Sequence, residues 1–117
     1  MNDAVQSLSV VPRSVIQQMA DLIARQFLPE KIILFGSYAR GEPEGHSDVD
    51  LMVIMENPLP RPQRTAPIIR LIHQHFNVPV DVVVRSPEGH AAWAEARYSL
   101  SREVAREGIV LYEKPRR

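Results

Sequence analysis

The stretch over residues 32–54 constrains the fold of this chain more than any other. It begins with an apolar run typical of a buried strand, turns at Gly36-Ser37 into a polar loop, and ends in a second apolar strand that opens with Asp48 and Asp50. Side chains on a strand alternate between the two faces of a sheet, so Asp48 and Asp50 are expected on one face. Two such close carboxylates repel each other, which predicts a bound cation or, without one, a raised pKa.

The remaining sequence predicts an α+β fold. Hydrophobic periodicity predicts helices over 12–27, 65–76 and 86–107. Short apolar runs bounded by breakers predict strands over 31–35, 48–55, 78–84 and 109–112. Residues 57–62 contain three prolines and are expected to form a surface loop. Asn77 is expected to cap the C-terminus of the helix over 65–76. This order of elements predicts a small mixed sheet of about four strands with helices packed on one face.

Length and composition narrow the class of protein. The chain has 117 residues, enough for one domain, which we place at 12–117 after a lead-in at 1–11. Fourteen basic and fourteen acidic residues give a net charge of zero, which argues against a nucleic-acid polymerase role. The sequence contains no cysteine, which excludes disulfides and thiol catalysis. It shows neither a signal peptide nor an apolar run that could span a membrane, so a cytoplasmic location is expected.

A third carboxylate, Asp81, interrupts the apolar run at 78–84. Aspartate is depleted inside strands, so both Asp50 and Asp81 need a physical reason. A single buried aspartate is more often structural than catalytic. Three aspartates on neighbouring strands near a Gly-Ser turn are better explained as one shared site.

The glycine turn at residues 36–41 has the two-glycine spacing of a phosphate-binding P-loop. Glu42 stands where that motif requires lysine and Pro43 where it requires serine or threonine, which excludes a P-loop. Glycine still lets a backbone approach a phosphate closely. Taken alone, the Gly-Ser pair favours an ordinary strand-to-helix turn, because both residues are common in turns.

The combination of Gly36-Ser37, Asp48-Val-Asp50 and a later Asp81 resembles the nucleotidyltransferase signature of the DNA polymerase β-like superfamily. Two further stretches are similar to the small stand-alone members called minimal nucleotidyltransferases. These are Gly-Ser-Tyr-Ala-Arg-Gly-Glu at 36–42 and the closing Glu-Gly-Ile-Val-Leu-Tyr-Glu at 107–113. The resemblance covers residues 12–113 and implies the palm-like fold of the superfamily.

The resemblance also implies roles for individual residues. Asp48, Asp50 and Asp81 would be the catalytic residues and would hold two Mg²⁺ ions. Gly36 and Ser37 would hold the pyrophosphate that leaves. Arg40 would be a further phosphate contact in the nucleotide site, although a solvated arginine explains it equally well.

The function implied by this resemblance is transfer of AMP from ATP to a tyrosine hydroxyl of a cognate HEPN-domain toxin. The chain would then act as the antitoxin of a toxin–antitoxin pair and form a hetero-oligomer with the toxin. Two alternatives stay open on the sequence. One is a binding module that neutralises its partner without chemistry, and the other is a nucleotidyltransferase that modifies a small molecule such as an antibiotic.

Overall fold

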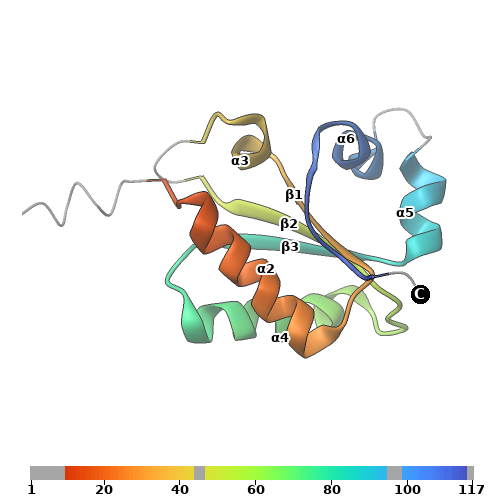
Figure 1. Cartoon of the computed structure of the whole chain (residues 1–117). Helices are drawn as coiled ribbons and strands as arrows, with labels where there is room; N and C mark the ends of the chain where they lie inside the picture. The colour runs from red at the N-terminus through yellow and green to blue at the C-terminus, as the bar shows by residue number, and fades with distance from the viewer. Residues whose placement is uncertain (1–9, 44–46, 95–98, 116–117) are drawn as a thin grey trace, which may run out of the picture.

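Four strands form one mixed sheet in the order β3-β2-β1-β4 (Figure 1). The structure is a computed structural model and describes residues 10–43, 47–94 and 99–115. The strands are β1 (Lys31–Phe35), β2 (Val49–Ile54), β3 (Val80–Arg85) and β4 (Ile109–Glu113). β1 runs antiparallel to β2 and β4, whereas β2 and β3 are parallel. The predicted α+β class with a mixed four-stranded sheet is confirmed.

Five helices accompany the sheet in the described part of the chain (Figure 1). They are α2 (Arg13–Phe27), α3 (Ser37–Arg40), α4 (Arg61–His75), α5 (Pro87–Ala94) and α6 (Leu100–Glu107). None of these helices is long and apolar enough to cross a membrane. Most of the expected lead-in at 1–11 lies outside the described residues.

One face of the sheet, called here the first face, is covered by α2 and α4. Ile16, Met19 and Ile23 of α2 and Ile68 and Ile72 of α4 are almost fully buried in one cluster. This cluster includes the odd-numbered residues of β2, namely Val49, Leu51 and Val53. Burying a large aliphatic side chain contributes roughly 1.5–3 kcal/mol, so this cluster is the main source of stability.

The opposite face, the second face, carries a smaller cluster under α6. Val104 of α6 packs with Ile33 and Phe35 of β1 and with Met52 and Ile54 of β2. The prediction that helices pack on one face only was therefore wrong. β1 and β2 are apolar on both faces, so both faces need a cover to remove apolar surface from water.

Three predicted boundaries also differ from the structure. α4 begins at Arg61, inside the expected loop at 57–62, because proline is tolerated at the start of a helix and Pro62 occupies its first turn. Helix α4 ends at His75, and its C-cap is Phe76, which is extended (φ −135°), so Asn77 is not the cap. The single helix expected over 86–107 is replaced by α5 and α6. Ser99 interrupts the expected helix, because its backbone is extended and its Oγ accepts a hydrogen bond from the Arg102 N–H, which caps α6.

Candidate active site

The turn between β1 and β2 begins at Gly36, which follows the last residue of β1. Its backbone (φ 76°, ψ −156°) lies in a region that is essentially restricted to glycine. A Cβ added to Gly36 would overlap the Asp50 carboxylate. Glycine is therefore required twice at this position, once for the backbone angles and once for the close approach to Asp50.

The chain then forms one helical turn, α3, which hydrophobic periodicity cannot detect because it has only four residues. The Ala39 and Arg40 N–H groups donate to the Gly36 carbonyl, and the Glu42 N–H donates to the Ser37 carbonyl over 2.9 Å. These hydrogen bonds close the turn into a compact unit. Ser37 is half-buried beside Gly36 at its start, and Arg40 is exposed at its end.

Two of the predicted carboxylates, Asp50 and Asp81, lie on strands and belong to the second face. Asp50 is the second residue of β2 and Asp81 is the second residue of β3, and the two are register partners. Met52 and Val83 follow them by two positions and lie in the second-face cluster, so alternation assigns Asp50 and Asp81 to that face. Asp48 directly precedes β2 with the same parity. The prediction that Asp48 and Asp50 share a face stays a prediction, because Asp48 lies just outside β2.

Asp50 has an unusual electrostatic environment. Partial burial, followed by the negative charges of Asp81 and Asp48, raises the pKa of Asp50 from 3.8 to about 6. Arg40 opposes this rise, and Glu103 of α6 adds a small further increase. The expected raised pKa among the carboxylates is confirmed for Asp50.

Nearness of the three aspartates does not by itself mean that they are arranged to bind a metal ion. Over residues 10–43, 47–94 and 99–115, no three carboxylate or imidazole side chains lie close enough together to form a ready ligand set. Asp48 and Asp81 are exposed, and Asp50 is half-buried. The structure therefore brings the three aspartates to one edge of the second face without closing them around a common point.

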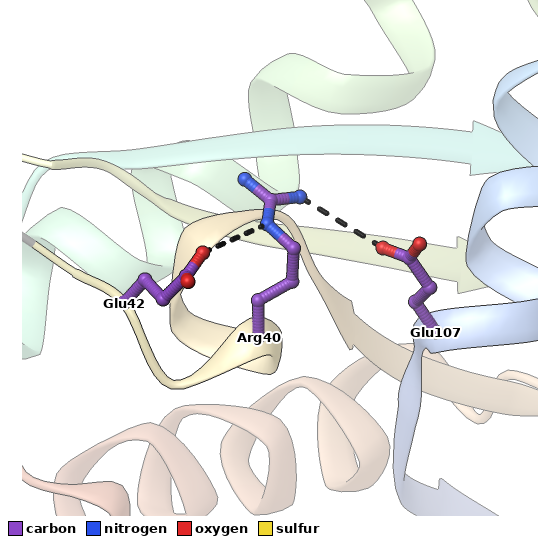
Figure 2. Close-up of polar contacts among 3 residues, drawn as sticks. All are labelled: Arg40, Glu42 and Glu107. Carbon is purple, nitrogen blue, oxygen red and sulfur yellow. Dashed lines mark ion pairs between the residues drawn. The ribbon is translucent and has the colours of Figure 1, made fainter.

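Arg40 lies between two carboxylates from different parts of the chain, as Figure 2 shows. Its Nε is 3.7 Å from Oε1 of Glu42, and its Nη1 is 4.0 Å from Oε1 of Glu107 at the end of α6. Glu103 and Glu107 were not among the site residues predicted from the sequence. The signal available was the closing motif at 107–113, which begins with Glu107.

Tyr38 has a structural position. Its ring is 7% exposed and belongs to the first-face cluster, and its hydroxyl accepts a hydrogen bond from the Val11 N–H over 3.0 Å. It therefore connects α3 to the segment that leads into α2.

Two of the three aspartates, Asp48 and Asp81, are exposed at the surface of the described part of the chain. A cavity of about 440 Å³ does occur in the structure, but it lies at the opposite end of the sheet. Its lining includes Lys31 and Ile54, which are the residues of β1 and β2 farthest from Gly36 and Asp50. The aspartates are thus accessible to a large substrate.

Comparison with models of protein families identifies the family of this chain. The family model described as the nucleotidyltransferase domain matches residues 16–110. The chain belongs to the nucleotidyltransferase domain family. It is therefore a nucleotidyltransferase, and the enzyme class expected from the sequence is confirmed.

This nucleotidyltransferase is similar to a candidate protein adenylyltransferase of Methanocaldococcus jannaschii. The two are 28% identical over 74 residues, which is 62% of this chain and 74% of the relative.

Solved structures share the fold. A candidate nucleotidyltransferase from Sulfolobus solfataricus aligns over 94% of this chain and 83% of its own, with a TM-score of 0.61 and 17% identity. A toxin–antitoxin crystallised with AMP-PNP aligns over 83% and 73%, with a TM-score of 0.61 and 23% identity. The toxin–antitoxin MntA–HpeT, in a tyrosine-to-alanine mutant, aligns over 89% and 74%, with a TM-score of 0.54 and 24% identity. At these identities the likeness concerns the fold, and it confirms the expected nucleotidyltransferase fold.

Proposed function

We propose that this nucleotidyltransferase transfers AMP from ATP to a hydroxyl group of a partner protein. The observation that carries the proposal is the register pairing of Asp50 with Asp81 on the open second face, directly beside the Gly36 turn. The relative from M. jannaschii, a candidate protein adenylyltransferase, supports a protein acceptor. The toxin–antitoxin neighbour bound to AMP-PNP supports an adenine nucleotide as the donor.

Asp48, Asp50 and Asp81 fit a magnesium site by their chemistry. Carboxylate oxygens are preferred ligands of Mg²⁺, and the repulsion that raises the pKa of Asp50 is the kind that a cation relieves. Two Mg²⁺ ions held there would neutralise charge on the triphosphate and make the acceptor hydroxyl easier to ionise.

The chain's own residues would then orient the two substrates. Gly36 and Ser37 would receive the pyrophosphate end of ATP, and Arg40 would contact its phosphates. The acceptor hydroxyl oxygen would attack the α-phosphorus, forming a new P–O bond while the bond to the bridging oxygen breaks and pyrophosphate leaves. Asp81 is exposed and would stand nearest the acceptor, where it would help to remove the hydroxyl proton.

The partner we propose is a HEPN-domain toxin modified on a tyrosine, with this chain as its antitoxin in a cytoplasmic hetero-oligomer. Two structural neighbours are toxin–antitoxin proteins, and one of them carries a tyrosine-to-alanine mutation. The open position of the aspartates suits a protein acceptor, because the partner would supply the other wall of the site.

Intact-mass spectrometry of the adjacent gene's product tests the proposal. The product is incubated with this protein, ATP and Mg²⁺, and it should gain one or more adenylyl masses. Asp48→Asn should abolish the gain, while Asp21→Asn, an exposed carboxylate on α2, should leave it intact. A stable complex without any mass gain would contradict the transfer reaction and favour neutralisation by binding.

A further inference from the structure

The contact between Arg40 and Glu107 joins the phosphate side of the site to a helix from the far end of the chain. In Figure 2, Arg40 extends from the end of α3 with one glutamate on each side. Glu42 faces Nε and Glu107 faces Nη1, and no ion pair to the third nitrogen, Nη2, is found among the described residues. Two of the three nitrogens therefore face a carboxylate, and Nη2 faces neither of the two glutamates.

The backbone fixes Glu107 opposite α3. Helix α6 ends at Glu107, and the next residue, Gly108, lies directly against β1. A Cβ on Gly108 would lie 2.5 Å from Cγ2 of Ile33 and 3.3 Å from the Leu34 carbonyl oxygen, so a larger residue would push α6 outward. β1 continues into Gly36 and α3, and both members of the Arg40–Glu107 pair are thus anchored on the same strand.

The two N···O distances show that the glutamates orient the Arg40 guanidinium but do not use up its hydrogen-bond donors. N···O separations of 3.7 and 4.0 Å are too long for hydrogen bonds, so the carboxylates attract the guanidinium without occupying its N–H donors. Arginine loses up to ~2 kcal/mol of side-chain entropy when it is immobilised. A side chain already confined by two carboxylates loses less of this entropy when it binds a phosphate.

We propose that Glu107 is a positioning residue, which holds Arg40 in the orientation that receives the phosphates of the nucleotide. This proposal rests on the proposed function and adds a residue that acts through Arg40 rather than on the substrate itself. It gives the first residue of the closing motif at 107–113 a role in nucleotide affinity.

The test is ATP affinity, measured by calorimetry in the presence of Mg²⁺ and without any acceptor. Glu107→Gln should weaken ATP binding about twofold to fivefold, the size expected when an exposed ion pair is lost. Glu113→Gln is the matched control, because Glu113 forms a similar exposed pair with Lys31 (3.8 Å) at the other end of the sheet. ATP affinity of the control should equal that of the wild type.

Two further variants separate positioning from a general effect on the fold. In an Arg40→Ala background, Glu107→Gln should cause no additional loss, because its effect passes through Arg40. Glu107→Asp keeps the charge and should restore part of the affinity. With the acceptor present, Glu107→Gln should raise the KM for ATP while kcat stays within about twofold.

The possible failures can be told apart. Unchanged or tighter ATP binding by Glu107→Gln, with normal binding by the wild type, would overturn the positioning role alone. Tighter binding would mean that Glu107 competes with phosphate for Arg40. If the wild type does not bind ATP, both the positioning role and the proposed function fail.

Discussion

Asp50 and Asp81 are register partners on two parallel, hydrogen-bonded strands, and both belong to the second face of the sheet. Their surroundings nevertheless differ, because Asp50 is half-buried against the Gly36 turn whereas Asp81 is exposed. This difference assigns them different tasks in the reaction we propose. Asp50 is held in one place by its surroundings, while Asp81 remains accessible to an acceptor.

The first prediction concerns the stability of Asp50→Asn. The pKa of Asp50 is raised from 3.8 to about 6 in the folded chain, so the folded state holds this proton more tightly than the unfolded state. The wild type therefore loses stability through this group as the pH rises from about 4 to about 6. Asp50→Asn removes this loss, so its free energy of unfolding should exceed that of the wild type by about 1 kcal/mol above pH 6. This figure allows for solvent screening of a partly exposed group. Urea unfolding across pH 4–8 without Mg²⁺ measures the difference between the two curves.

The same substitution should reduce adenylyl transfer by at least about 100-fold, since a charge-stabilising group at the reacting centre is lost. A variant that is more stable and inactive would identify Asp50 as a residue kept for chemistry at the expense of stability. Parallel pH curves for the two proteins would instead show that the charge of Asp50 is not strained in the folded chain.

The second prediction concerns magnesium. A ligand that binds only the folded state stabilises it, by about 1.4 kcal/mol at a free concentration tenfold above Kd. Mg²⁺ should therefore raise the Tm of the wild type, and the rise should be smaller or absent in Asp50→Asn and Asp81→Asn. Asp21→Asn, the exposed carboxylate on α2, should respond like the wild type. A similar reduction in all three variants would point to diffuse counterion binding instead of a site.

The third prediction compares two glycines that share a φ of 76°. Gly41→Ala places a methyl group in open space, so only backbone strain of about 1–2 kcal/mol is expected. Gly36→Ala adds overlap with the Asp50 carboxylate and should lower the free energy of unfolding by about 3 kcal/mol or more. Chemical denaturation measures both, and transfer activity should be lost in Gly36→Ala alone. Equal losses of stability would show that Gly36 and Asp50 are not tightly packed.

The fourth prediction concerns Tyr38. Tyr38→Phe keeps the buried ring but leaves the Val11 N–H without its acceptor, which should lower stability by about 1 kcal/mol. Tyr38→Ala also removes the ring from the first-face cluster and should lower the free energy of unfolding by about 3–5 kcal/mol. Tyr38→Phe should transfer AMP at the wild-type rate. A substantial loss of activity without loss of stability would instead assign the Tyr38 hydroxyl to the active site.

The placement of the aspartates could be predicted from the sequence because it depends on one local rule. Asp48, Asp50 and the apolar residues that follow obey the two-residue period of a strand, and that period alone assigns them to a face. Whether Asp81 lies beside Asp50 depends on strand order, which the local pattern does not determine. The expectation of neighbouring strands is confirmed by the parallel pairing of β2 with β3. The identity of Asp48, Asp50 and Asp81 as metal ligands remains a prediction.

Other features could not be predicted because they depend on contacts between distant segments or on elements too short to show a period. The pairing of Arg40 with Glu107 exists only once α6 has packed on β1. The division of residues 86–107 into two helices depends on the cap formed by Ser99, which competes with continued helical hydrogen bonding. The start of α4 was missed because prolines near a helix start resemble those of a loop.

The position of β2 in the sheet has a consequence for the motions of the site. β2 is hydrogen-bonded to a neighbour on each side, and every one of its residues except Asp50 is buried. Amide hydrogens of such a strand exchange with solvent only when most of the domain unfolds, whereas a single helical turn such as α3 opens far more readily. One part of the site, on β2, therefore opens slowly, and the other part, on α3, opens quickly. Asp50 belongs to the part that stays in place on every timescale short of unfolding. Arg40, although Glu42 and Glu107 orient it, belongs to a turn that can open without unfolding of the domain.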